Sequence, residues 1–463
     1  MVRQLRILAS QFYVLRTGTL TEIRSEICTN RSDEITKTAD VFNRILNTFG
    51  TRLASAVLNL LIAVIVSRVL GPEGKGLQGL ILATIAYIIV FANLMGGGAI
   101  VYLVPRFNYS LLLLPAYVWT ILTGLLFFAV IRLSGLIDPQ YALHVSILAI
   151  FNAFASVNSS ILVGKEKIKT SNLIAFIQPF VIMVSLLIAF FVFKEKSVDA
   201  YIVSLYISFF SALLISLAYL RKYAGRFVMS TFSMYWPVVA KLFRYGLLNQ
   251  LAHIFQLLSF RMSFYWLEQV YSEAEVGIYS NAASLVESIW LISRSISLVQ
   301  YARIANTEDL DYARKLTISL SKASMFLSLI LLIILVVLPA QFFVFVFGPG
   351  FEGVGEVIRS LAPGVLFFNF ALVGGHYFSG TGKYHVNTLA SLLGLIISII
   401  LFAVMIPAYG MTGAGWATSI SYTITAIFVL IWFLQESKMK AGVFIPEKSD
   451  FKALVEALRN LRK

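Results

Sequence analysis

The sequence predicts an all-α protein that crosses a membrane about twelve times, as two related lobes of six helices. Composition is the first observation behind this prediction: 59% of the 463 residues are hydrophobic, only 13% are charged, and the mean hydropathy is +0.83. A soluble domain carries about 25% charged residues. The second observation is a series of long apolar stretches, and the third is a phrase that recurs in each half of the chain.

Twelve stretches contain the roughly 20 apolar residues that a helix needs to cross the hydrocarbon core of a bilayer. A large soluble helical core would instead need amphipathic helices with a polar face, and most of these stretches have none. We therefore predict transmembrane helices over 44–69, 77–104, 109–132, 140–163, 168–193, 198–220, 236–267, 275–302, 314–339, 356–381, 384–407 and 411–434.

The recurring phrase follows an apolar helix in each half, with an offset of 201 residues. Its first copy is Val69–Gln78 (VLGPEGKGLQ), and its second is Val270–Tyr279 (VYSEAEVGIY). A further pair, Val163–Lys167 and Ser379–Lys383, opens another apolar helix in each half. Repeated halves are how many transporters build a central site that can face either side of the membrane in turn.

The predicted helices organise the chain as two lobes and a linker. We assign 44–221 to the first lobe, 222–235 to a basic and polar cytoplasmic linker, and 236–435 to the second lobe. A cytoplasmic N-terminal extension (1–43) and a cytoplasmic C-terminal tail (436–463) flank them. All loops are short, so no segment outside the membrane could fold as a catalytic domain. This argues against a membrane glycosyltransferase, polymerase or ligase, and we expect no enzyme activity.

Lys and Arg residues indicate the orientation. They concentrate in the N-terminal extension, in the loops that would share its side of the membrane, and in the C-terminal tail. Cytoplasmic loops carry an excess of Lys and Arg, so both termini are predicted to lie in the cytoplasm. The net charge of +14 is then a signal of topology, and its scatter over many loops does not favour nucleic-acid binding.

Polar side chains recur at helical spacing inside two of the predicted helices. In the first helix, Arg52 and Asn59 share a face with Thr48 and Ser55. In the seventh, the matching face carries Asn249, His253 and Gln256, which are the positions reached by the offset of 201. Two polar stripes in register with the repeat indicate a cavity shared by the two lobes.

Charged residues are also predicted within the membrane. They are Arg261 on the seventh helix and Glu287 and Arg294 on the eighth, in addition to Arg52. A charge near the bilayer centre costs about 2.5–3.5 kcal/mol on insertion scales. Two interpretations remain open: a wet cavity that binds an anion, or pairing of Glu287 with an arginine that only holds the helices together.

The residue types decide what such a cavity could bind. Arginine grips phosphate and carboxylate through forked hydrogen bonds, so the cavity suggests a phosphorylated, membrane-borne substrate. None of the four histidines has metal-ligand spacing with a carboxylate, and the single cysteine, Cys28, cannot form an intrachain disulfide. We expect no metal and no cofactor.

Three passages of the chain resemble a known family. SRVLGPEGKGLQGLILATI (67–85), VGIYSNAASLVESIWLISRSISLVQ (276–300) and YFSGTGKYHVNTLASLLGL (377–395) are similar to the bacterial polysaccharide flippases of the O-antigen type. These belong to the multidrug/oligosaccharidyl-lipid/polysaccharide exporter superfamily. The resemblance covers about 44–435 and rests on phrases at helix ends, so it specifies the fold better than the substrate.

The resemblance implies a MATE-like fold, with a central cavity lined by the first, second, seventh and eighth helices, and alternating access. It also implies transport of an undecaprenyl-diphosphate-linked oligosaccharide from the inner to the outer leaflet of the bacterial cytoplasmic membrane, for lipopolysaccharide or capsule synthesis. The chain departs from the lipid II flippase, since it lacks that protein's two additional helices. Lipid II is therefore a less favoured substrate.

Under this hypothesis each polar residue has a role. Arg52 and Arg294 would hold the diphosphate with help from His253 or Arg261, and Asn59, Asn249 and Gln256 would meet sugar hydroxyls. Glu287 would pair with Arg294 in the empty cavity or carry a coupling proton or sodium ion, and the sequence does not decide between these.

The remaining partners are membrane lipid and, as an open alternative, polysaccharide polymerase or assembly proteins. An ion-coupled exporter of small amphipathic molecules is the alternative function within the superfamily. A non-transporting scaffold of an envelope-synthesis complex is a third. An exporter of cations would need cavity acids, and this chain has one such acid against several bases, which favours the flippase.

Reporter fusions test the predicted orientation. Fusions after Lys167 and Lys383 are expected to report a cytoplasmic location, and fusions after Lys75, Lys196 and Glu352 an external one, because Lys and Arg concentrate around the first set. A paired phosphatase and fluorescent-protein reporter at each position measures this. A consistent exchange of the two sets would refute both the orientation and the lobe assignment.

Overall fold

The computed structural model describes residues 48, 50–224, 227, 231–307 and 309–444. The chain divides into two compact units, 1–53 and 54–463, and Arg52 belongs to the first of them. Within the described ranges the regular secondary structure is helical throughout. The predicted N-terminal extension lies outside the described residues, as does most of the C-terminal tail.

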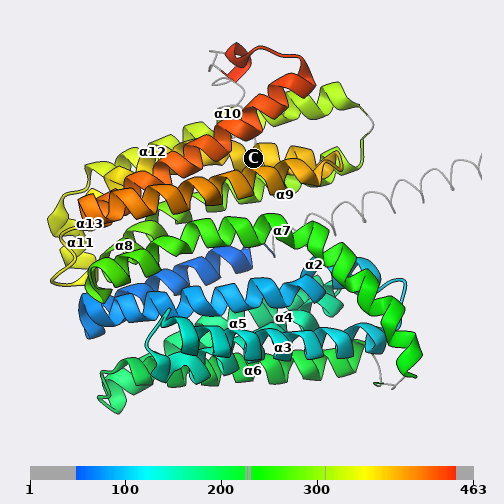
Figure 1. Ribbon diagram of the computed structural model, residues 1–463, viewed down its shortest axis with the longest axis horizontal. Helices are drawn as coiled ribbons and strands as arrows, with labels where there is room; N and C mark the ends of the chain where they lie inside the picture. The colour runs from blue at the N-terminus through cyan, green and yellow to red at the C-terminus, as the bar shows by residue number, and fades with distance from the viewer. Residues whose placement is uncertain (1–47, 49, 225–226, 228–230, 308, 445–463) are drawn as a thin grey trace, which may run out of the picture. The chain divides into compact units, whose positions relative to one another are not determined.

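The described chain is helical from its first residues, and most of its residues lie in helices (Figure 1). A long helical segment from Gly50 continues through a 3₁₀ turn, η1 (Asn93–Met95), into α2 (Gly97–Leu103). The helices that follow are α3 (Tyr109–Ser134), α4 (Ala142–Gly164), α5 (Ile168–Leu187), α6 (Val198–Ala224), α7 (Phe232–Val270), α8 (Glu273–Ser288), α9 (Trp290–Ala305), α10 (Leu310–Val337), α11 (Ala340–Phe347), α12 (Val354–Gly380) and α13 (Tyr384–Ser437).

Two of these helical segments are too long to be single spans. Gly50–Leu103 and Tyr384–Ser437 each contain 54 residues, which would extend for about 80 Å if straight, against a hydrocarbon core of about 30 Å. Each is interrupted by a glycine with positive φ, Gly71 at +70° and Gly410 at +56°. Glycine adopts this left-handed conformation without steric cost. Each segment therefore contains two helices joined at its glycine.

Within the described residues the predicted stretches fall largely on helices, and the start of the first stretch, 44–47 and 49, lies outside those residues. Eight of these helices are long and apolar enough to cross a membrane, or nine if the bent pair of α8 and α9 counts as one span. The two 54-residue segments each count once in this total. The prediction of an all-helical, polytopic membrane fold is confirmed.

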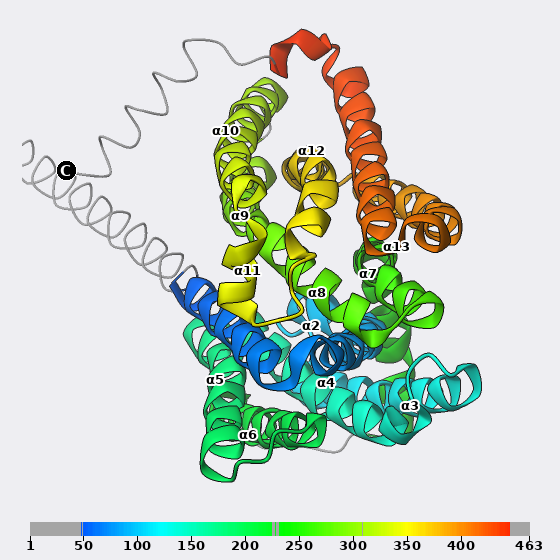
Figure 2. The same cartoon turned by 90° about the vertical axis from the view of Figure 1, so that its left-hand side faces the viewer.

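The helices form two groups, which Figures 1 and 2 show on opposite sides of α7. In the first group α3, α4, α5 and α6 pack on one another, and in the second α8, α9, α10 and α13 pack around α12. Helix α7 contacts both groups. Its first turns bury Tyr235, Val238 and Leu242 against the first group, and its later part packs along α13.

An aromatic cluster lies at the centre of the second group. Phe260 of α7, Trp290 of α9, Phe368 of α12 and Tyr422 of α13 all contact one another, with ring centroids 4.9–5.5 Å apart. The Trp290 indole donates a hydrogen bond to the Val365 carbonyl at 3.1 Å, so its polar group is satisfied. In a membrane, such close packing replaces the hydrophobic effect as the main force that holds helices together.

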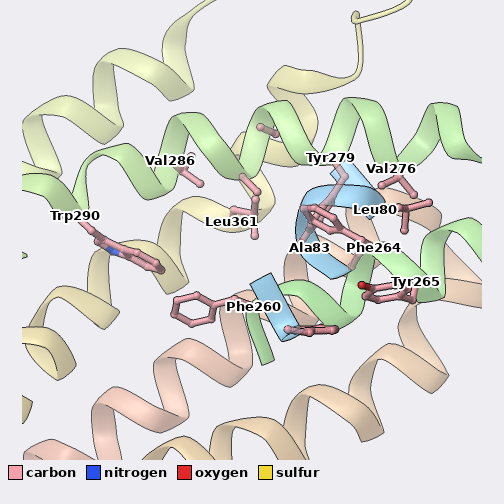
Figure 3. Packing of buried hydrophobic residues seen from close by; sticks show 14 of the residues in the cluster. Leu80, Ala83, Phe260, Phe264, Tyr265, Val276, Tyr279, Val286, Trp290 and Leu361 are labelled. Carbon is pink, nitrogen blue, oxygen red and sulfur yellow. The ribbon is translucent and has the colours of Figure 1, made fainter. Parts of the chain in front are cut away.

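The core continues from this cluster into the first group. Leu80 and Ala83 lie beside Phe264, Tyr265 and Tyr279 of the second half of the chain (Figure 3). The Tyr265 hydroxyl and Thr84 Oγ1 are 2.8 Å apart and share a hydrogen bond. The two halves are therefore in direct side-chain contact at the level of the repeated phrase.

The two copies of the repeated phrase contact each other reciprocally. A Cβ added at Gly76 would overlap the carbonyl oxygen of Glu273, and one added at Gly277 would overlap the carbonyl oxygen of Pro72. The offset of 201 converts the first contact into the second, because Gly76 corresponds to Gly277 and Pro72 to Glu273. The contact is therefore self-complementary, as at a two-fold interface, and it requires glycine on both sides.

Polar contacts reinforce this crossing. The Asn281 amide donates to Ser67 Oγ at 2.8 Å, and the Arg68 guanidinium donates to the backbone carbonyls of Phe345 and Val346. Lys75 is buried, with 5% of its surface exposed, and donates to Gln78 Oε1 at 2.7 Å. We had assigned Lys75 to an external loop; the helix instead resumes directly after Gly71 and carries Lys75 into the contact region.

The substitution Gly277→Ala is expected to keep the two halves apart at this crossing, since its Cβ has no space beside Pro72. Cysteines introduced by Ser67→Cys and Asn281→Cys, in a Cys28→Ser background, report the contact by oxidative crosslinking on gels. We expect Gly277→Ala to lower the yield several-fold. Gly79→Ala is the matched control, because its nearest neighbour would lie at an ordinary 3.5 Å. An unchanged yield in Gly277→Ala would contradict the requirement for glycine.

Candidate functional site

A cavity of about 390 Å³ opens within the second helix group. Helices α7, α9, α12 and α13 line it, and its polar lining contains hydroxyl, amide and imidazole groups but no carboxylate. These polar residues are His253, Gln256, Tyr301, His376, Ser379, Tyr384, Asn387, Thr388, Ser391 and Thr425. Such a lining suits a ligand rich in hydroxyl groups, or an anion.

Hydrogen bonds within the wall orient two of these side chains. His376 Nδ1 lies 2.8 Å from the Leu372 carbonyl. A carbonyl only accepts, so Nδ1 carries a proton, which leaves Nε2 available for other contacts. The Asn387 amide donates to the Gly375 carbonyl at 2.8 Å and to Ser379 Oγ at 2.9 Å. Because its nitrogen is thus engaged, Asn387 can offer a ligand its carbonyl oxygen.

Arg294 gives this part of the second group a positive charge. Its guanidinium lies 6.0 Å from the centroid of the Trp290 ring, and it interacts electrostatically with both His253 and His376. The Arg294 side chain is exposed. Together the guanidinium and the two imidazoles provide several hydrogen-bond donors that one anion could engage.

The aromatic cluster separates the cavity from a buried ion pair. Phe368 lines the cavity and also belongs to the cluster. Beyond the cluster, Arg261 of α7 donates two hydrogen bonds to the two carboxylate oxygens of Glu287 on α8, at 2.9 and 2.7 Å. This forked geometry is a strong form of ion pair in proteins. The two opposite charges neutralise each other, and both side chains are half-buried.

The sequence leaves the partner of Glu287 open, and Arg294 is one candidate. Those two residues would share a face of a straight helix, but the helix is broken between Ser288 and Trp290, so α8 and α9 follow different axes. Glu287 meets Arg261 on the neighbouring helix instead. Arg261, which we had expected to assist in binding diphosphate, is committed to this pair.

The structure places some of the other predicted site residues at the cavity and others away from it. His253 and Gln256 line the cavity together, as their spacing on α7 predicted. Asn59 is exposed on the first helix and does not line this cavity. Arg52 belongs to the separate unit that ends at Leu53, and the side chain of Asn249 lies outside what the structure describes. The predicted sharing of one cavity by both polar stripes remains a prediction.

Several lining residues were not among the predicted site residues. His376, Ser379 and Asn387 lie on either side of the second loop phrase, Ser379–Lys383, and Tyr301 lies on α9. The helical spacing of Asn387 and Ser391 at i and i+4 was a signal that could have found part of this wall. Tyr301 and Tyr384 had no such signal, because tyrosine is equally common in lipid-facing and interfacial positions.

Comparison of the sequence with known families gives one match. Residues 43–298, more than half of the chain, match the family described as polysaccharide biosynthesis protein. An uncharacterized membrane protein of Methanocaldococcus jannaschii is 24% identical over 204 residues, which are 43% of this chain and 40% of that protein. The chain therefore matches less than half of that relative's length.

Solved structures share the fold at low sequence identity. An inward-facing multidrug resistance MATE family transporter of the MOP superfamily has a TM-score of 0.68 at 16% identity, over 84% of this chain and 96% of that chain. The lipid II flippase MurJ, in an inward closed conformation, also scores 0.68, at 15% identity over 86% and 89%.

A MOP superfamily transporter from Pyrococcus furiosus scores 0.60 at 14% identity, over 86% and 96% of the two chains. The binding pocket of that protein is described as having reverse polarity. These similarities establish a MATE- and MurJ-like fold for this chain, as the resemblance of its helix-end phrases predicted. The proteins that supply them are transporters and not enzymes.

Replacing Arg261 is expected to destabilise the folded protein. Breaking a buried ion pair costs about 3–5 kcal/mol, and we expect the lower end of this range because the two side chains retain 26% and 16% of their exposure. Arg261→Gln should therefore lower the midpoint of thermal unfolding in detergent, and adding Glu287→Gln should restore most of it.

Asp311→Asn serves as the control for this experiment. It breaks an exposed i, i+3 pair with Arg314, and such pairs contribute about 0–1 kcal/mol. A stable Arg261→Gln variant would show that Glu287 does not depend on Arg261.

Proposed function

Because the chain belongs to the polysaccharide biosynthesis protein family, we propose that it carries a polyprenyl-diphosphate-linked oligosaccharide from the inner to the outer leaflet of the cytoplasmic membrane. The proposal includes alternating access between the two sides, with both termini in the cytoplasm. Transfer of the lipid-linked sugar would supply the enzymes that polymerise and assemble a surface polysaccharide.

The composition of the cavity carries this proposal. Its lining contains two imidazoles beside Arg294 and no carboxylate. A diphosphate is a compact anion that such donors suit, whereas a drug-like cation would need an acid in the wall. Glu287, an acid predicted to lie within the membrane, is neutralised by Arg261 on the far side of the aromatic cluster.

The neutral polar groups of the cavity support a sugar ligand. Gln256, Asn387, Ser391 and the two tyrosines can exchange hydrogen bonds with hydroxyl groups on the glycan. The volume of about 390 Å³ lies within the usual range for small-molecule sites. It can enclose the diphosphate and the first sugars, while the rest of the glycan extends from the opening.

We assign the remaining polar residues of the two stripes to the same substrate. Arg52 would add a second cation for the diphosphate, and Asn59 and Asn249 would bind sugar hydroxyls once the two halves enclose the ligand. The apolar outer surfaces of the helices would leave the prenyl chain in the lipid. These assignments follow from the helical spacing of the stripes and their register with the repeat.

The reciprocal crossing at Gly76 and Gly277 supports alternating access. It lies where the two halves meet, within a core to which both halves contribute. A self-complementary contact of this kind is a suitable point about which two related halves could move relative to each other. If Glu287 carries a coupling proton or sodium ion, the ion must first displace Arg261, which makes the pair a barrier to ion coupling.

Transport by purified protein tests the proposal. In proteoliposomes that contain a fluorescent polyprenyl-diphosphate oligosaccharide, Arg294→Gln should slow transfer between leaflets. Loss of a charge-assisted hydrogen bond costs about 1.5–3 kcal/mol, or roughly 10- to 100-fold. Arg294→Lys should rescue transport only in part, since a point charge cannot reproduce a forked contact.

Arg303→Gln is the matched control. Arg303 is an exposed arginine on the same helix, and nine residues of α-helix place it on the face opposite Arg294. Its loss should leave transport unchanged. Normal transport in Arg294→Gln, or transport restored by adding Glu287→Gln, would refute a direct role for Arg294. Absence of transfer by the wild-type protein would favour the scaffold or exporter alternatives.

A further inference from the structure

A second cavity, of about 420 Å³, lies between α5 and α6 in the first helix group. Its lining is Leu173 and Ile177 of α5 with Ile215, Ala218, Tyr219 and Lys222 of α6. Leu173 and Ala218 are exposed, so the cavity opens on the outer surface of this pair of helices. None of the residues that line this cavity belongs to the proposed substrate site. A ligand in this cavity is therefore independent of the proposed transport function.

Two of the lining residues also pack against a small core. Ala155, Ala212 and Leu213 form part of this core, and Ile215 and Tyr219 pack against it. The rest of the wall is apolar along about one turn of α5 and one turn of α6, with Tyr219 and Lys222 at one end. An apolar channel on a surface that faces acyl chains suits a single acyl chain.

One end of the cavity is cationic and aromatic. Lys222 lines this end, and its ammonium lies 5.4 Å from the centroid of the Tyr223 ring. The ammonium of Lys167, from the loop before α5, lies 5.1 Å from the same ring. Tyr219 and Tyr223 stack with their centroids 6.1 Å apart, and this fixes the ring that both lysines contact.

The two ammonium groups share one aromatic neighbour, because both lie within 5.4 Å of the Tyr223 centroid. Among the described residues neither forms a salt bridge with a carboxylate. Glu166, the acid next to Lys167, is exposed and has an interaction of its own. Arg221 and Lys169, both exposed, add to the positive charge of the same helix ends. An anion bound between the lysines would relieve their repulsion.

We propose that the cavity between α5 and α6 binds an anionic phospholipid, with one acyl chain in the apolar channel and the phosphate of the headgroup between Lys167 and Lys222. Charge complementarity and the apolar wall together select this ligand. A free phosphate would leave the channel unfilled, and a zwitterionic lipid would bring its own cation to the two lysines. The loop-charge pattern places this end at the cytoplasmic leaflet, where anionic lipids concentrate.

Native mass spectrometry of the full-length protein tests this proposal, with phosphatidylglycerol and phosphatidylcholine of identical acyl chains as probes. The wild-type protein should retain one phosphatidylglycerol per chain in preference to phosphatidylcholine. Each lysine near an anionic lipid contributes about 1 kcal/mol, so Lys167→Gln with Lys222→Gln should weaken this binding by about 30-fold. Phosphatidylcholine binding should not change.

Two control variants separate the site from general lipid contact. Lys241→Gln removes another exposed lysine that lies over an aromatic ring, at 4.7 Å from the Phe107 centroid, but it lines no part of this cavity. It should leave phosphatidylglycerol binding intact. Ala218→Trp fills the channel and should abolish the retained lipid, while Leu217→Trp, on an exposed neighbouring position outside the lining, should not.

Three results would overturn the proposal. Equal retention of the two lipids, or equal retention by wild-type and the double lysine variant, would show contact without recognition of the headgroup. Displacement of phosphatidylglycerol by an equimolar polyprenyl diphosphate would assign the cavity to the tail of a transported lipid. Because Arg294 lies outside this cavity, loss of lipid binding with Arg294-dependent transport intact would distinguish this site from the substrate site.

Discussion

The close crossing of the repeated phrases at Gly76 and Gly277 is the constraint on which the rest of the structure depends. Here the backbones approach so closely that no side chain fits between them, and the residue facing each glycine is the repeat counterpart of the residue facing the other. This crossing brings Lys75, Thr84 and Tyr265 into a common core at one end of the two helix groups.

Charged side chains within the apolar region occur in two different arrangements. Arg261 and Glu287 form a closed pair that satisfies its own hydrogen bonds, so its role is to hold α7 against α8. Arg294 instead lies exposed, near two imidazoles, where its positive charge can attract an anionic ligand. The closed pair favours stability, and the exposed cation favours binding.

Much of this organisation could be predicted from the sequence, and the exceptions have physical causes. The twelve helical stretches and the positions of His253 and Gln256 follow from apolar length and helical period. The partner of Glu287 could not be predicted, because it depends on the break between α8 and α9 and on which helix packs alongside. The wall formed by Tyr301 and Tyr384 depends on packing between distant segments, which local periodicity does not encode.

The aromatic cluster of Phe260, Trp290, Phe368 and Tyr422 has a consequence for the energy supply of the cell. A membrane potential of 100 mV acts on each elementary charge with about 2.3 kcal/mol, so a wet path through a carrier would dissipate the gradient that the cell maintains. The four rings pack against one another with centroids 4.9–5.5 Å apart, which disfavours a file of water molecules through the cluster itself. Such packing is what electrical insulation within a carrier requires.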